Sequence, residues 1–176
     1  MANDKIEQID ISQRITYRNV FEYSNNLKED AYIVLSNCDI FFDAGLARVR
    51  KSGLVSERKA FTLLRHEYNC IELKECNLFG PRCESQDTWI WNSKWKISND
   101  LLKLFNMNLG LPGCDNKIVH LLNLSGFICH NEPEWIKCYH IHQTAIREYA
   151  DKEERASKPY YGIFPVTKEN KDQKHN

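Results

Sequence analysis

The chain has 176 residues, and its 24 basic and 24 acidic side chains give a formal net charge of +0 at pH 7. A chain of this length buries ~70% of its unfolded surface, so we expect one compact domain. The balanced charge argues against a nucleic-acid binder, because such domains usually carry a basic face. No stretch approaches the ~20 apolar residues of a membrane span, and the start "MANDKIEQID" lacks the plan of a signal peptide. We therefore expect a cytoplasmic protein with no membrane span.

The patterns in chain order predict helices over 16–28, 44–53, 98–107 and 115–126, and strands over 31–36, 59–67, 87–92, 127–131 and 136–142. Thr16 is expected to cap the first helix, Ser98 or Asn99 the third, and Asp115 or Asn116 the fourth. Strands that alternate with helices favour an α/β layer fold. The charged residues 151–176 are expected to form an extension with a disordered tail, outside a domain of residues 1–150.

The seven cysteines are an odd number without an export signal, which favours reduced thiols over a disulfide framework. Cys70, Cys76 and Cys83 are separated by five and six residues, wider than the spacing of structural zinc sites. A nucleophilic pair such as Cys114 with His120 has no recognisable local signature. Neither cysteine site is favoured.

Asn37 and Asp39 follow directly after the predicted strand at 31–36, in the stretch "YIVLSNCDIFFD". Ligands gather at the carboxyl ends of strands in open α/β sheets, and carboxylate oxygens suit Mg²⁺ or Mn²⁺. The simpler interpretation is a turn built from Asx residues. Local sequence alone favours the turn, because short Asx motifs often occur without function.

Two further acidic residues are candidates for acid–base chemistry. Asp87 precedes the aromatic strand "TWIW" and is either a base or a strand cap beside two core tryptophans. Asp115 follows the glycine-rich turn "GLPG", where it is either a helix cap or an ionised carboxylate able to deprotonate a hydroxyl. The commoner use of Asp in such a place is the cap.

His140 and His142 point to the same face of the predicted strand at 136–142, a spacing that suits a metal ion. An exposed pair of this kind is more often incidental. Arg147 follows and offers a planar fork to a phosphate group.

Four motifs taken together resemble the glycosyltransferases of the GT-A type, in particular those of large DNA viruses and bacteria that modify capsids or polysaccharides. They are "AYIVLSNCDIFFD", "SQDTWIW", "LGLPGCDNKIVHLLNLSGFICHN" and "IKCYHIHQT". The resemblance extends from about Arg14 to Tyr149. It implies an α/β sandwich, a mixed sheet flanked by helices, that transfers a sugar from a nucleotide-sugar donor to a hydroxyl of a carbohydrate or glycoprotein acceptor.

The resemblance also implies roles for individual residues. Asp39 would bind Mn²⁺ or Mg²⁺ on the donor diphosphate, with His142 as the first and His140 as the second choice for a further ligand. Asp115 would be the catalytic base of an inverting reaction, with Asp87 as the alternative. The expected donor-binding residues are Asn37, Asp39, Arg14, Arg65 and Arg147.

Only about thirty residues precede the strand at Tyr32, fewer than the first βαβ half of a nucleotide-binding domain requires. The fold is therefore expected to be a GT-A-like sandwich that is truncated at its N-terminus. An alternative function follows from this: a non-catalytic module derived from a glycosyltransferase that binds a sugar, a nucleotide or a partner protein.

Overall fold

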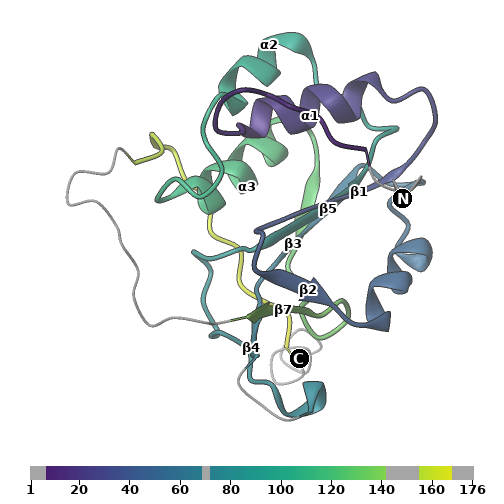
Figure 1. The fold of residues 1–176 in the computed structure, drawn as a ribbon, viewed down its shortest axis with the longest axis vertical. Coiled ribbons are helices and arrows are strands. Elements are labelled where there is room, and N and C mark those ends of the chain that lie inside the picture. The colour runs from purple at the N-terminus through teal and green to yellow at the C-terminus, as the bar shows by residue number, and fades with distance from the viewer. Residues whose placement is uncertain (1–6, 69–71, 142–154, 168–176) are drawn as a thin grey trace, which may run out of the picture.

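The structure is a computed structural model and describes residues 7–68, 72–141 and 155–167. It is a mixed α/β fold in which helices and two mixed sheets pack together (Figure 1). This confirms the expected fold class at the level of α/β. Within the described ranges, no helix has the length and apolar character needed to cross a membrane.

The larger sheet has the strand order β1-β5-β3-β6. Its strands are β1 (Tyr32–Ser36), β3 (Lys59–Leu63), β5 (Thr88–Asn92) and β6 (Ile128–His130). The central strand β5 is antiparallel to β1 and β3, whereas β3 and β6 are parallel. The smaller sheet has the order β2-β7-β4, formed by β2 (Ile40–Phe42), β4 (His66–Tyr68) and β7 (Cys138–Ile141).

Three α-helices pack in the half of the molecule away from the small sheet (Figure 1). They are α1 (Tyr17–Asn26), α2 (Asn99–Leu102) and α3 (Cys114–Leu124), and the 3₁₀-helix η3 (Lys103–Phe105) extends α2. Two further 3₁₀-helices are η1 (Ala44–Lys51) and η2 (Leu73–Glu75). Thr16 caps α1 as expected, in a capping box that it forms with Asn19.

Side chains of β5 alternate between two cores, as the two-residue period of a strand requires. Trp89 and Trp91 face the α-helices, where Trp91 lies 4.6 Å from Phe21 between ring centroids. Ile90 faces the other core with Val49 of η1. A strand buried on both faces explains why Trp89 and Trp91 alternate with the apolar Ile90.

The predicted continuous strand at 59–67 is wrong, because the chain changes sheets after Leu63. The Leu64 amide donates to Oδ1 of Asn131 at 3.0 Å instead of continuing the ladder of β3. Residues from His66 onwards then pair with β7 as β4. Arg65 therefore lies between the two sheets.

The predicted cap of α3 is also wrong. Gly113 is the N-cap, with a φ of 81° that favours glycine, and Asp115 lies within the first turn. The side chain of Asp115 is therefore available for other contacts. The helix ends at Leu124 with Ser125 as its C-cap, and Gly126, whose φ is 82°, turns the chain directly after it, close to the predicted end.

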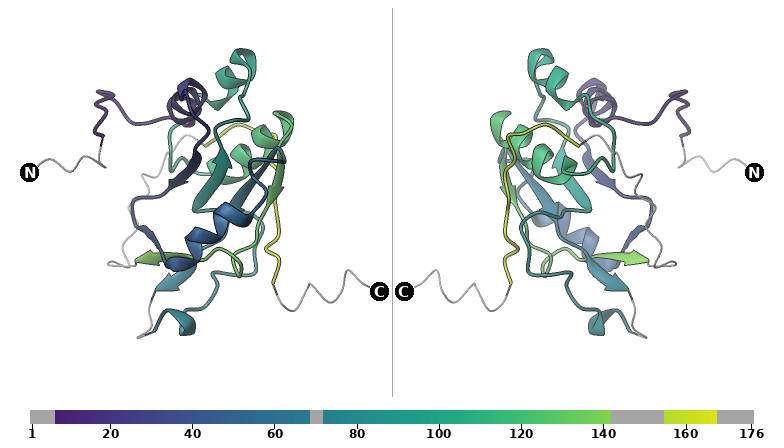
Figure 2. Two further views of the ribbon diagram at one scale, coloured as in Figure 1. Left: turned by 90° about the vertical axis from the view of Figure 1, so that its right-hand side faces the viewer. Right: turned by 90° about the vertical axis from the view of Figure 1, so that its left-hand side faces the viewer.

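Residues 155–167 lie against the domain. The Ala156 amide donates to the Pro112 carbonyl at 3.0 Å, and the Val166 amide donates to the Asn131 carbonyl at 2.7 Å. Figure 2 shows this segment, in yellow, running beside β6. Residues 151–154 and 168–176, which complete the expected extension, lie outside the described ranges.

One cysteine departs from the expected reduced state, since Cys76 is disulfide-bonded. Its sulfur therefore offers no thiolate ligand. Cys38, Cys83, Cys114 and Cys129 are free thiols, as is Cys138.

Candidate active site

The segment after β1 forms the predicted turn, and the side chains of Asn37 and Asp39 make contacts beyond it. The Ile40 amide donates to the Asn37 carbonyl at 3.2 Å, which makes the predicted turn. The Asn37 side chain also leaves the turn, and its Nδ2 donates to Oδ1 of Asp87 at 3.1 Å. Asp39 extends in the other direction, with 46% of its side chain exposed.

Asp39 meets the imidazole of His140. Nε2 of His140 lies 2.9 Å from Oδ2 of Asp39, and Nδ1 lies 3.2 Å from Oε2 of Glu67. The small sheet causes this arrangement, because β7 lies between β2 and β4 and His140 is paired with Ile40 on one side and Glu67 on the other. The His140 side chain is only 7% exposed, whereas its partner Asp39 reaches solvent.

These side chains fit one end of a divalent-cation site. If Nδ1–H donates to Glu67, a neutral imidazole presents the Nε2 lone pair towards Asp39, as in carboxylate–histidine–metal sites. The separation of 2.9 Å between Nε2 and Oδ2 is close to the ~3 Å expected for neighbouring ligands about 2.1 Å from an octahedral ion. Among the described residues, no group of three or more His, Cys, Asp and Glu side chains has the geometry of a complete metal site.

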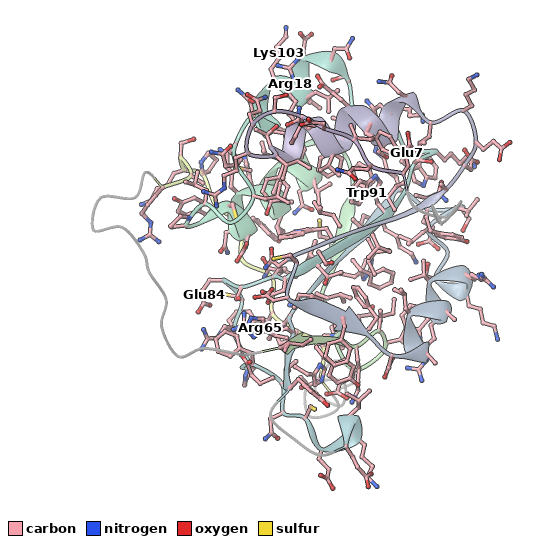
Figure 3. The ribbon with its side chains drawn as sticks, in the orientation of Figure 1. Glu7, Arg18, Arg65, Glu84, Trp91 and Lys103 are labelled. Carbon is pink, nitrogen blue, oxygen red and sulfur yellow. The ribbon has the colours of Figure 1, made fainter. Side chains whose placement is uncertain are left out.

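Arg65 connects this end to Asp87. Its Nε donates to Oε1 of Glu67 at 2.9 Å, and its Nη1 donates to both carboxylate oxygens of Asp87 at 3.1 and 3.2 Å. Burial would raise the pKa of Glu67, but Arg65 and His140 together lower it below its usual value. Figure 3 shows Arg65 beside the small sheet, far from Trp91 in the helical half.

We call these linked side chains the polar network. It consists of Asp39, His140, Glu67, Arg65, Asp87 and Asn37. Within it Asp87 is 5% exposed and accepts from both Arg65 and Asn37. Burial raises the pKa of Asp87, although these two donors oppose the rise. A carboxylate held by two fixed donors is suited to positioning, since both of its oxygens are already engaged.

Asp115 is the carboxylate with the more perturbed proton affinity. Burial and the negative charge of Asp87 raise its pKa to about 7, against a usual value near 3.8. The thiol of Cys114 donates to Oδ1 of Asp115 at 3.3 Å, and the Gln86 amide stabilises the same carboxylate. A carboxyl group that titrates near neutral pH is able to accept a proton during a reaction and release it afterwards.

The neighbouring thiol is not a nucleophile candidate. Burial and the charge of Asp115 raise the pKa of Cys114 to about 12, so the thiolate is scarce. Its sulfur instead accepts from the Tyr17 hydroxyl at 3.3 Å. Hydrogen bonds from Tyr17 to Cys114 and from Cys114 to Asp115 hold the Asp115 carboxyl group next to the α-helices.

Other candidates lie elsewhere. Arg14 donates to the Leu109 carbonyl at 2.9 Å, in the loop before α3. His142 and Arg147 lie outside the described residues. Glu67 was missed by the sequence, although its two-residue spacing from Arg65 in a strand-like stretch was an available signal.

A groove of about 380 Å³ lies between β1 and η1, separate from the polar network. It is lined by Tyr32, Val34, Asp43, Ala44, Leu46, Ala47, Val49 and Arg50. None of the polar-network side chains lines it, so its shape adds nothing to the assignment of the site.

The structure thus brings together six of the residues selected from the sequence, from five different parts of the chain. These are Asn37, Asp39, Arg65, Asp87, Asp115 and His140. Comparison of the chain with protein-family models, curated proteins and solved structures finds no match. The proposal below therefore depends on the sequence motifs and on this geometry.

Proposed function

We propose that this protein is a glycosyltransferase that moves a sugar from a nucleotide-sugar donor to a hydroxyl acceptor, with inversion at the anomeric carbon. The observation that carries the proposal is the carboxyl group of Asp115, buried within the electrostatic reach of Asp87. Burial and the negative charge of Asp87 raise the pKa of Asp115 to about 7, and Asp87 itself is held by Arg65. Neighbouring carboxylates in different environments commonly divide the roles of proton acceptor and fixed charge.

In the proposed reaction the acceptor oxygen attacks the anomeric carbon, and the bond from that carbon to the diphosphate oxygen breaks. Asp115 takes the proton of the hydroxyl, and the diphosphate leaves with the electron pair. Asp87 keeps Arg65 and Asn37 in place through its two oxygens. General-base assistance of this kind contributes ~10²–10⁴-fold to rate.

Asp39 and His140 would hold Mn²⁺ or Mg²⁺, with Glu67 fixing the imidazole ring. Such an ion, when bound, offsets the charge that develops on the leaving diphosphate. Because 46% of the Asp39 side chain is exposed, a ligand can approach this end from solvent. The polar network extends from this end to Asp87, whose negative charge acts on the carboxyl group of Asp115.

The test is a donor screen with UDP-, GDP- and dTDP-sugars, with and without Mn²⁺, that measures hydrolysis and transfer to simple glycosides. We expect at least one donor to be consumed in a metal-dependent reaction. Asp115→Asn should bind that donor normally but lose about 10²-fold or more in rate. Asp87→Asn should weaken binding as well, because it releases Arg65.

The measurements distinguish a wrong choice of catalytic base from a protein that binds a donor without turning it over. Full transfer activity in Asp115→Asn would remove this residue from the base role. Binding of a donor without any turnover, in the wild type and in both variants, would instead support the alternative of a non-catalytic sugar- or nucleotide-binding module.

A further inference from the structure

Two arginine side chains, those of Arg65 and Arg82, stack on the aromatic ring of Phe79. The guanidinium carbon of Arg65 lies 3.9 Å from the ring centroid, and that of Arg82 lies 3.8 Å from it. The Phe79 amide donates to the Arg65 carbonyl at 3.0 Å, so the ring is fixed against the polar network. The same ring therefore contacts both guanidinium groups, and Arg82 lies next to the Arg65 end of the polar network.

The two arginines differ in how their charges are balanced. Arg65 binds Asp87 and Glu67, whereas no carboxylate in the described ranges forms an ion pair with Arg82. In the same ranges, the buried Nε of Arg82 has no hydrogen-bond partner. A stacked guanidinium keeps its planar edge available, and that edge matches the oxygens of a phosphate group.

The loop that carries Arg82 lies between the two ends of the site. The Cys83 carbonyl accepts from Nε2 of Gln86 at 3.0 Å and from the Ile163 amide at 3.1 Å. The backbone amide of Gln86 in turn hydrogen-bonds to the carboxylate of Asp115 and stabilises its charged form. Arg82 is therefore fixed between the network around Arg65 and the start of α3.

We propose that Arg82, stacked on Phe79 beside Arg65, is a binding group for a phosphate anion carried by the substrate. The inference deepens the proposed function and rests on it for the identity of this anion, a nucleoside diphosphate. Arg82 has no carboxylate partner among the described residues, and a doubly charged phosphate is attracted to its guanidinium group more strongly than a singly charged carboxylate is. Arg82 thus adds a cation to the site beside Arg65.

The test compares Arg82→Gln with Arg58→Gln as a matched control. The guanidinium carbon of Arg58 lies 4.8 Å from the ring of Phe127, and its Nε also is buried without a partner in the described ranges. Arg58 precedes β3 whereas Arg65 follows it, so the control lies at the opposite end of that strand. The melting temperature of both variants verifies that they fold.

Affinity is measured by calorimetry for inorganic pyrophosphate, for UDP and GDP, and for the corresponding nucleosides, with and without Mg²⁺. We expect Arg82→Gln to weaken pyrophosphate and nucleoside-diphosphate binding ~10-fold or more, and to leave nucleoside binding unchanged. Arg58→Gln should bind within about twofold of the wild type. Stronger binding of a dicarboxylate such as malonate than of pyrophosphate would overturn the assignment to phosphate.

The outcomes separate this inference from the proposed function. Arg82-dependent binding of pyrophosphate in a protein that transfers no sugar would leave the inference standing and remove the enzyme assignment. Sugar transfer with the same donor KM in Arg82→Gln and in the wild type would overturn the inference alone. An absence of pyrophosphate binding in the folded wild-type protein would also overturn it.

Discussion

Nε2 of His140 lies 2.9 Å from Oδ2 of Asp39, although 101 positions of sequence separate the two residues. The contact exists because β2 and β7 are neighbours in the small sheet and pair Ile40 with His140. Glu67 contacts the other nitrogen of the imidazole ring, Nδ1, and so fixes its orientation. The same three side chains explain how a short turn after β1 becomes one end of a proposed active site.

Asp39→Ala should remove any stabilisation of the protein by Mn²⁺ or Mg²⁺, because it deletes the exposed carboxylate of this end. Glu67→Gln should keep binding but weaken it ~10- to 100-fold, the usual effect of changing a group that orients a histidine ligand. The measurement is the melting temperature as a function of metal concentration. Asp100→Ala is the control, since its side chain is 92% exposed and pairs only with Lys103 in the described ranges. An undiminished metal effect in Asp39→Ala would exclude Asp39 as a ligand.

Asp115 should make the folding stability depend on pH. Its pKa rises from about 3.8 in the unfolded chain to about 7 in the fold, so folding favours the protonated form. Stability is therefore highest below pH 4 as far as this group is concerned, and decreases as the pH rises to 7. The full effect is on the order of 4 kcal/mol at about 1.4 kcal/mol per pKa unit, before solvent screening reduces it.

Asp115→Asn removes this dependence. We expect the variant to be more stable than the wild type at pH 8 by a few kcal/mol and nearly equal to it at pH 4. Urea unfolding at both pH values measures the difference. Asp100→Asn serves as an exposed control, and the same gain at pH 4 and pH 8 in Asp115→Asn would show that packing rather than ionisation is responsible.

Removing Arg65 alone should destabilise the fold strongly. Arg65→Met leaves Asp87 buried without its main partner, which typically costs ~3–5 kcal/mol. Adding Asp87→Asn should recover a large part of this loss, because no unpaired charge then remains buried. Unfolding free energies of the two single variants and the double variant form the measurement. Additive losses would mean that the ion pair contributes no coupling energy.

Gly113→Ala should destabilise more than Gly126→Ala, although the two glycines have nearly the same φ, 81° and 82°. Both alanines cost ~1–2 kcal/mol for the left-handed backbone. A Cβ at position 113 would lie only 3.1 Å from the Tyr160 hydroxyl, whereas a Cβ at position 126 would lie 3.5 Å from Nε of Arg58. The first variant should also expose residues 155–167 to limited proteolysis, and equal stability losses would argue against that contact.

Periodicity and turn chemistry identified most elements, because they report local backbone preferences. The strand at 31–36 corresponds to β1 (Tyr32–Ser36), and Thr16 caps α1 as expected. The break at Leu64 was not predictable, because its amide bonds to Asn131, a residue 67 positions away. The cap of α3 was misassigned because glycine and aspartate, here two positions apart at Gly113 and Asp115, both favour helix starts, and only the backbone geometry selects Gly113.

By itself the sequence determined which acidic and imidazole groups lie within or next to strands and helix starts, among them Asp39, Asp87, Asp115 and His140. The tertiary structure alone decided that Asp39 meets His140, that Glu67 joins them, and that Arg65 connects Glu67 to Asp87. Local patterns describe each segment and the face it presents to its neighbours. Proton affinities and ligand geometry instead depend on charges within a few ångströms, and those distances exist only once remote strands have paired.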